Sequence, residues 1–484
     1  MRIASLGAAL VSLSMVMRPL AAQRPAPTIH VVDMIPAQFS GETNQDSEPF
    51  LAVNPATPDV MAASAFTADP AGAPNTAPIF VSRNGGLKWT LNSIVRSDQM
   101  TADISHAFSE TGASWFAGIL SRPMPSNDTV LKELNSLDVT SSTLSNEQAT
   151  RNHVDQPFVV AANGRVYVGS NDFGASQGRT ASVDVSLDGG KTYAIHRIET
   201  RKTSGQDGPS VRLTTSKDGT VYAALLAWRS TKGSDVTADV VVVRDDKGAV
   251  SASAFADLKD PSDSLAGRIV AKGVTIPWVN GAAIGNQRIG STLSIAADPN
   301  NSATVYVAWG DRAGNGDIYT IHVRRSSDRG VTWSSDVRTL KNAVNVALAV
   351  ADNGTIGLLY QQLDGTGAAT RWSTRLEQTR NAFQTQQASE LTRALVNHPS
   401  PQFQPYLGDY IMLIASGAEF RGVYSASNAA DKANFPQGLP TYQRKADFTN
   451  KKLLDGAGGT VGVSIDPFYA SVPVMTPGVQ RSLP

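Results

Sequence analysis

The side chains of this chain that could act on a polar ligand are carboxylates, arginines and aromatic groups beside predicted strands. Carboxylates can transfer protons, and a tyrosine can act as a nucleophile. The predicted catalytic candidates are Asp46, Glu48, Asp311 and Tyr410. Arginines can hold an anionic ligand, and an aromatic ring can pack against a sugar. The predicted ligand-binding candidates are Arg179, Arg229, Arg312 and Trp309.

One short segment, Trp309-Gly310-Asp311-Arg312, combines a ring, a carboxylate and a guanidinium. This combination suits sugar binding, and the alternative is a packed tryptophan beside a local ion pair. Asp311, Asn315 and Asp317 could also form an oxygen-rich calcium loop. The chain has no cysteine, six histidines and no His-x-x-x-His spacing, which argues against thiol chemistry and zinc. We therefore expect no metal site and no cofactor, with calcium as the alternative.

The strongest pattern in the sequence is an octad that occurs three times, at residues 82–89, 186–193 and 326–333. Each copy reads Ser, any residue, Asp or Asn, any residue, Gly, two further residues, and an aromatic residue. The defining residues are Ser82, Asn84, Gly86, Trp89, Ser186, Asp188, Gly190, Tyr193, Ser326, Asp328, Gly330 and Trp333. An Asp or Asn side chain can accept backbone hydrogen bonds across a turn, and Gly supplies a positive φ. We interpret the octads as structural hairpin turns.

A repeated hairpin turn indicates repeated sheets, and repeated sheets around an axis form a β-propeller. Strand-like segments recur at blade spacing, and the pair Glu48-Pro49-Phe50 and Gln156-Pro157-Phe158 is itself an internal repeat. The 40 Gly, 26 Pro and 17% charged residues fit many turns and short strands. We predict an all-β, seven-bladed propeller of four-stranded antiparallel blades, with six blades as the alternative.

We expect one propeller domain at 28–473, with an insertion at 257–286 and a frayed tail at 474–484. A terminal strand should close the ring, and residues 28–32 are favoured over residues 460–465. The octads are expected between third and fourth strands, on one face. Ligand-binding groups are expected on the other face, where first strands start and second strands end. This placement adds Asp103, His106, Asp155, Gln156, Asn171, Asp172, Asp207, Arg288, Gln361 and Asp409 to the candidates.

The octads resemble the Asp-box, or BNR repeat, of the sialidase superfamily. The resemblance implies a propeller that acts on glycans with a Tyr nucleophile, a Glu partner, an Asp acid/base and three arginines. The early Phe/Tyr-Arg-Ile-Pro motif of the family is absent, and Glu48-Pro49-Phe50-Leu51 stands nearest to its place. Two functions stay open: an exo-glycosidase of the sialidase type, or a non-catalytic propeller that binds a glycan or an extracellular protein.

The charge balance and the N-terminus predict where the protein works. Lys plus Arg equals Asp plus Glu at 42 each, which argues against nucleic acid as a partner. Arg2 and the apolar run 3–17 precede Leu20-Ala21-Ala22, a pattern typical of a signal peptide over 1–22. We predict a secreted or periplasmic bacterial protein that has no membrane span and is a monomer.

Overall fold

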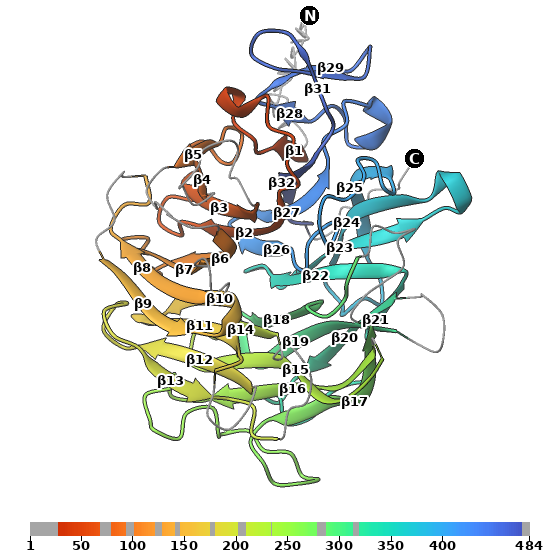
Figure 1. Ribbon diagram of the computed structural model, residues 1–484. Helices are drawn as coiled ribbons and strands as arrows, with labels where there is room; N and C mark the ends of the chain where they lie inside the picture. Colours follow the sequence, from red (N-terminus) through yellow and green to blue (C-terminus); the bar gives the residue numbers. More distant parts are fainter. Residues whose placement is uncertain are drawn as a thin grey trace, which may run out of the picture.

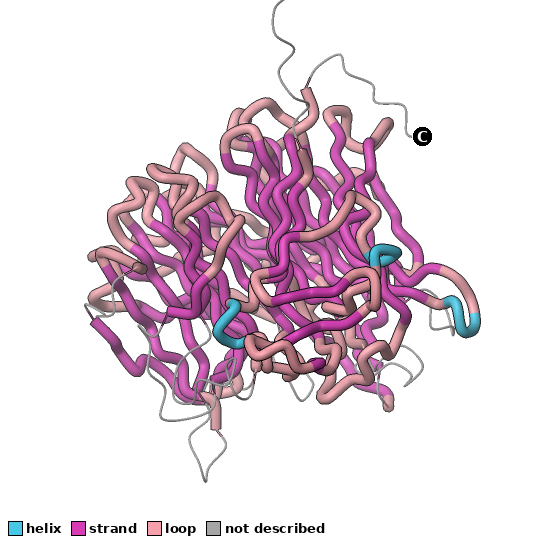
Figure 2. Tube along the Cα trace, turned by 90° about the horizontal axis from the view of Figure 1, so that it is seen from above, coloured by secondary structure: helices cyan, strands magenta, loops and turns pink. Residues whose placement is uncertain are grey.

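The computed structural model describes residues 28–67, 79–92, 101–121, 128–140, 146–174, 180–201, 210–233, 235–277, 287–312 and 319–476. The predicted signal peptide, Arg179, Asp207, Asn315, Asp317 and the end of the predicted tail lie outside these ranges. In the described parts the protein is all-β, and Figure 2 shows strands with a few short helical turns. These turns are η1 (Ala37–Phe39), η4 (Gly367–Ala369) and η5 (Lys432–Asn434).

Six sheets each contain four antiparallel strands in chain order (Figure 1). The first two are β2 (Ser47–Val53), β3 (Met61–Phe66), β4 (Ile79–Ser82) and β5 (Thr90–Asn92), then β6 (Thr101–Phe108), β7 (Trp115–Ser121), β8 (Val130–Ser136) and β9 (Asn146–Asn152). The next two are β10 (Val154–Ala162), β11 (Arg165–Asp172), β12 (Thr180–Ser186) and β13 (Ala194–Arg197), then β14 (Val211–Thr215), β15 (Val221–Lys232), β16 (Asp235–Asp245) and β17 (Arg268–Pro277). The last two are β18 (Leu293–Asp298), β19 (Asn301–Arg312), β20 (Tyr319–Ser326) and β21 (Arg338–Lys341), then β22 (Ala343–Val350), β23 (Ile356–Asp364), β24 (Arg371–Thr379) and β25 (Gln387–Leu395).

Two further sheets complete the described structure. A five-stranded sheet has the order β26 (Met412–Ser416), β27 (Glu419–Ser427), β32 (Ile465–Pro473), β1 (His30–Asp33) and β28 (Thr441–Tyr442). A small sheet contains β29 (Lys445–Asp447), β30 (Lys452–Leu454) and β31 (Thr460–Val461). Over the described residues, no helix has the length and apolar character needed to cross a membrane.

The first strands of the larger sheets contact one another in a closed ring, β2–β6–β10–β14–β18–β22–β26 and back to β2. In Figure 1 the chain accordingly passes once around a common centre, from red through green to blue. Sheets placed radially around a channel in this way define a β-propeller.

The core lies between neighbouring sheets, and the run Val240–Val243 in β16 shows why. Val241 and Val243 pack toward the sheet of β10–β13, whereas Val240 and Val242 pack toward the sheet of β18–β21. Because side chains alternate along a strand, a sheet covered on both faces needs apolar residues at successive positions. A propeller blade meets this condition, since each blade packs between two others.

The octads form one common turn between third and fourth strands, as predicted. In the middle copy Ser186 Oγ accepts from Gly190 N over 2.8 Å, and Asp188 Oδ1 accepts from Thr192 N over 2.9 Å. The other two copies make the same pair of bonds. The glycine is required: Gly86 has a φ of 87°, and a Cβ there would lie 2.2 Å from the Tyr469 ring.

The sequence pattern misses a fourth copy of this turn, between β24 and β25. Phe383 N donates to Thr379 Oγ1, and Thr385 N donates to Asn381 Oδ1, each over 3.0 Å. Ala382 and Phe383 take positive φ values of 51° and 65°, as do the equivalent pairs Gly85–Gly86, Gly189–Gly190 and Arg329–Gly330. The hydrogen bonds therefore preserve the turn although the serine and glycine of the pattern are replaced.

The N-terminal strand closes the ring, as the sequence favours. β1 pairs with β32 in antiparallel register, with Val31 opposite Ala470. Of residues 460–465, the other predicted closing strand, Thr460–Val461 instead belongs to the small sheet as β31. Within the segment 257–286 that the sequence marks as an insertion, Arg268–Pro277 is β17 and pairs with β16 as an outer strand.

Candidate functional site

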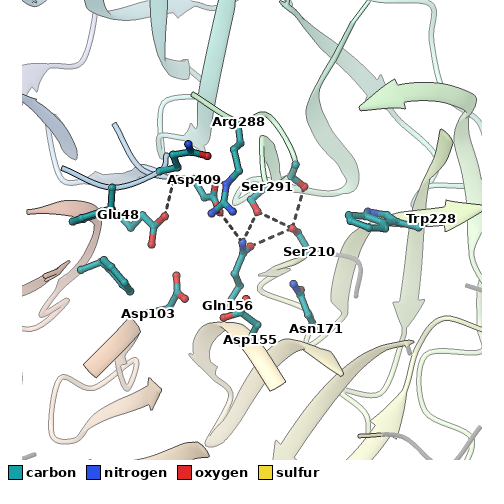
Figure 3. A pocket seen from close by; sticks show the side chains of 14 residues that line it. Glu48, Asp103, Asp155, Gln156, Asn171, Ser210, Trp228, Arg288, Ser291 and Asp409 are labelled. Carbon is teal, nitrogen blue, oxygen red and sulfur yellow. Dashed lines mark hydrogen bonds and ion pairs between the residues drawn. The ribbon is translucent and has the colours of Figure 1, made fainter. Parts of the chain in front are cut away.

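A cavity of about 370 Å³ lies where the first strands of several sheets begin. Its size falls within the range of small-molecule sites. The lining residues come from first-strand starts, second strands and the connection between β25 and β26. They are Glu48, Phe66, Asp103, Asp155, Gln156, Asn171, Ser210, Trp228, Arg288, Gly290, Ser291, Phe403, Gln404 and Asp409. Figure 3 shows the carboxyl groups of Glu48, Asp103 and Asp155 near one another, with Trp228 on the opposite side.

β-bulges direct several of these side chains into the pocket. The pairing register shifts between Ser47 and Phe50 in β2 and between Asp155 and Phe158 in β10. Glu48 and Gln156 lie within these shifts and have positive φ values of 54° and 48°. Such φ values are unusual for residues other than glycine, and bulges re-aim side chains at functional sites. The repeated Pro-Phe motif therefore marks two equivalent bulges at the pocket.

Gln156 connects several sheets across the channel. Its Nε2 donates to Asp409 Oδ2 over 3.2 Å and also to Ser291 Oγ, while its Oε1 accepts from Ser210 Oγ over 3.2 Å (Figure 3). Ser210 and Ser291 also share a hydrogen bond of 3.1 Å. Because all of these groups are buried, the network holds the first strands in fixed relative positions.

Arg288, Asp409 and Glu48 form a second chain of contacts. Arg288 Nη2 donates to Asp409 Oδ2 over 2.6 Å, and Asp409 N donates to Glu48 Oε1 over 3.1 Å. Burial raises the pKa of the Glu48 carboxyl well above its usual range, and the carboxylates of Asp103 and Asp409 raise it further. Burial also raises the pKa of Asp409, although Arg288 opposes this effect. Burial and the neighbouring carboxyl groups therefore favour the protonated form of Glu48.

Arg212 and Tyr410 lie beneath the pocket and are not among its lining residues. The Arg212 guanidinium carbon is 5.4 Å from the ring centroids of both Phe158 and Tyr410. Burial raises the pKa of the Tyr410 phenol well above its usual range, with further contributions from Asp103 and Glu48. Tyr410, predicted from the sequence as a catalytic residue, is therefore a buried phenol that keeps its proton.

Two buried glutamines fix the segment 396–411, which carries Phe403 and Gln404 to the pocket. Gln45 Nε2 donates to the carbonyl oxygens of Phe403, Pro405 and Tyr406, and its Oε1 accepts from Gln402 N over 2.8 Å. Gln287 Oε1 accepts from Leu407 N over 2.7 Å. These hydrogen bonds hold the segment in place, so that it forms one wall of the pocket.

The structure brings part of the sequence-predicted set together. Among the four predicted catalytic residues, Glu48 lines the pocket. Six further residues that were predicted from their position on the ligand-binding face also line the pocket: Asp103, Asp155, Gln156, Asn171, Arg288 and Asp409. Asp46 lies elsewhere, in a buried cluster, where burial and then Glu42 and Asp466 raise its pKa well above the usual range.

The other predicted residues that the structure describes are not among the lining residues of the pocket. Trp309 is 1% exposed, and its Nε1 donates to Asp311 Oδ2 over 3.1 Å, which matches a packed tryptophan rather than a sugar platform. Arg312 pairs with Asp235. Arg229 bridges Glu199 and Asp239 over 3.1 and 2.8 Å. These side chains of β15 and β19 therefore bond to other protein groups and not to the pocket.

Sequence reasoning missed Ser210, Ser291 and Trp228. The serines precede β14 and β18, so extending the choice of residues at first-strand starts to serine would have found them. Trp228 lies in the apolar run of β15, so the sequence does not distinguish it from the core residues of that strand. Among the described residues, no three acidic or histidine side chains come together as metal ligands. Calcium at Asp311 therefore stays a prediction, because Asn315 and Asp317 lie outside the described ranges.

The fold and the pocket together define a class: a β-propeller with a carboxylate-rich cavity at one end of its channel. No protein-family model matches the sequence, and no curated protein matches it. Similar solved structures include an α-L-arabinanase of Penicillium chrysogenum complexed with arabinobiose, with 14% identity, coverage of 69% of this chain and 94% of that chain, and a TM-score of 0.42.

Two other similar structures also have glycan-related names. An ulvan lyase bound to a glucuronic acid–sulfated rhamnose unit has 11% identity, coverage of 79% and 92%, and a TM-score of 0.47. A neuraminidase-like protein from a flat-faced bat isolate has 9% identity, coverage of 92% and 91%, and a TM-score of 0.37. At such identities and TM-scores the likeness says nothing of what this chain binds or does.

Proposed function

We propose that this protein binds a glycan in the central pocket and hydrolyses a glycosidic bond there. The observation that carries the proposal is the buried Glu48 beside Asp103 in a cavity open to a ligand. Glycosidases pair a carboxylic acid that protonates the leaving oxygen with a carboxylate that supports the positively charged transition state. Glu48 is the proton donor, and Asp103 supplies the negative charge.

A neutral or cationic sugar suits this pocket better than a sialoside. The carboxylate of a sialoside would need guanidinium groups, as in the sialidase superfamily that the octads resemble. Arg288 already donates from Nε and Nη2 to Asp409. A sialoside is therefore less well supported as the substrate than a neutral or cationic sugar.

We also propose a seven-bladed, exported, monomeric protein. The closed ring of first strands supports seven blades, with the small sheet β29–β31 as an addition to the ring. Export rests on the sequence pattern over 1–22, and one domain over 28–473 rests on ring closure by β1.

A second candidate function is a propeller that binds a glycan or protein without catalysis. The observation in its favour is that Gln156, Ser210, Ser291 and Arg288 are bonded to one another or to Asp409, as in a rigid recognition surface.

A panel of fluorogenic glycosides, sialosides included, tests the proposal with purified protein. We expect turnover of at least one neutral or amino glycoside, and a loss of roughly 100-fold or more in kcat for Glu48→Gln. Asp352→Asn is the control, because the Asp352 side chain is 75% exposed and forms its ion pair with exposed Lys217. Absence of turnover across the panel would overturn the hydrolase and leave the binding candidate, which a glycan array then tests.

A further inference from the structure

The charges that line the pocket are unbalanced. The lining includes the carboxyl groups of Glu48, Asp103, Asp155 and Asp409 and one guanidinium, that of Arg288. Both Nε and Nη2 of Arg288 donate to Asp409, so this pair largely neutralises itself. The remaining carboxyl groups make the wall rich in hydrogen-bond acceptors.

The nearby Arg212 offsets part of this charge, because it interacts electrostatically with Asp103, Asp409 and Glu48, but it does not present its donors to a ligand. Its Nη1 donates to Val211 O over 2.9 Å, and its Nη2 donates to Gln156 Oε1 over 3.4 Å and to Ser291 O over 3.3 Å. The rings of Phe158 and Tyr410 flank the same guanidinium. Its donors are therefore directed at protein groups beneath the cavity and not at a ligand.

Asn171 provides independent evidence that the pocket accepts a hydrogen-bond donor from a ligand. It is 2% exposed, it lines the cavity, and its Oδ1 has no hydrogen-bond partner among the residues that the structure describes. It lies opposite Asp155 in the pairing of β10 with β11, and Figure 3 shows its side chain beside that of Asp155. Buried amide oxygens are rarely left without a donor, because the lost hydration is not replaced.

We propose that the pocket selects a sugar that carries a protonated primary amine, such as a hexosamine unit without an N-acetyl group. Asp103 and Asp155 balance the ammonium charge, and Asn171 Oδ1 accepts one of its hydrogens. An organic cation fits better than a metal ion, because the described carboxylates do not group as metal ligands. This inference rests on the proposal that the pocket binds a glycan.

Calorimetric titration with three trisaccharides tests it: β-1,4-linked glucosamine, its fully N-acetylated form, and β-1,4-linked glucose. We expect the glucosamine trimer to bind at least about tenfold more tightly than the other two, with a preference that falls as sodium chloride is added. Asp103→Asn should remove most of the preference, and Asp352→Asn should keep it.

Asn171→Ala separates a ligand role from a structural role. We expect it to weaken glucosamine-trimer binding by about tenfold while the urea midpoint stays the same or rises, because the removed oxygen has no partner in the described part of the chain. A lower urea midpoint with unchanged binding would overturn the role of Asn171.

The failure of this inference and the failure of the proposed hydrolase are distinguishable. Equal affinity for the three trimers, a salt-independent preference, or no binding of any trimer would overturn the amine selectivity. Cleavage of a neutral glycoside by the same protein would still support the hydrolase. Tight binding of the glucosamine trimer without cleavage of any glycoside would support the amine selectivity and overturn the hydrolase.

Discussion

Arg288 and Asp409 form a two-point ion pair at the centre of the channel mouth, with Nε to Oδ1 at 3.1 Å and Nη2 to Oδ2 at 2.6 Å. The Asp409 side chain is 5% exposed and that of Arg288 is 21% exposed. Asp409 also contacts Gln156 and, through its backbone N–H, Glu48. The pair therefore links the acid group of the pocket to the network that holds the first strands together.

Removing Arg288 should destabilise the folded chain. Arg288→Met leaves the buried Asp409 carboxylate without its cation, and such a loss costs about 3–5 kcal/mol. Urea unfolding measures the change. Arg329→Met is the matched control: its partners Asp218 and Asp246 are 38% and 36% exposed, so we expect a loss of about 1 kcal/mol or less. Equal losses for the two variants would contradict the structural importance of the Arg288 pair.

Deprotonation of Glu48 should lower the stability of the protein as the pH rises. The pKa of Glu48 is raised by burial and by Asp103, so the folded state binds more protons than the unfolded state above the ordinary glutamate pKa. Stability from this carboxyl is full below its ordinary pKa and is lost as the pH rises through the raised pKa. Glu48→Gln should flatten this decline and raise the urea midpoint at pH 8 more than at pH 5. The same gain at both pH values would show that Glu48 does not titrate as described.

The unrecognised fourth turn should be as important as a recognised one. Asn381 Oδ1 accepts from Thr385 N over 3.0 Å, and Asn84 Oδ1 accepts from Lys88 N over 2.9 Å. Asn381→Ala and Asn84→Ala should each lower the free energy of unfolding by about 1 kcal/mol. Urea titration of both variants beside Asp352→Asn checks this. No effect for Asn381→Ala with a clear effect for Asn84→Ala would mean that the fourth turn holds through its backbone alone.

The sheet that closes the ring depends on Arg444. This fully buried guanidinium pairs with Asp466 and lies 3.6 Å from Asp33 Oδ2 on β1. Arg444→Met should cost about 3–5 kcal/mol at neutral pH. Burial and Asp466 already raise the pKa of Asp33, and Arg444 opposes this, so the variant should lose more stability at pH 8 than at pH 5. Thermal unfolding of both proteins at the two pH values measures this difference. The same loss of stability at both pH values would contradict the prediction and would mean that the Asp33 carboxyl stays neutral in the folded state.

Arg312→Ala should leave glycan turnover and binding unchanged. Its side chain pairs with Asp235 on β16 and does not line the pocket. The fluorogenic panel and the calorimetric titrations measure this directly. A large loss of turnover with an unchanged urea midpoint would restore the sequence-based prediction that Arg312 binds the ligand.

The octads and the apolar pattern of the strands were sufficient to predict the propeller and the face on which the candidate pocket lies. Each octad encodes its turn through contacts within seven residues, so its conformation is readable without knowledge of the rest of the chain. The same local logic placed Glu48, Asp103, Gln156 and Asp409 at first-strand starts, and these residues do line the pocket.

Only the tertiary structure decided which of these residues act together. Glu48 and Asp409 are 361 positions apart, and the closed ring brings them into contact. Trp309 and Arg312 share the chemistry of a sugar site, yet their strand turns them toward Asp311 and Asp235. Proximity between distant segments and the burial that shifts a pKa are properties of the closed ring, so residue type and spacing along the chain do not specify them.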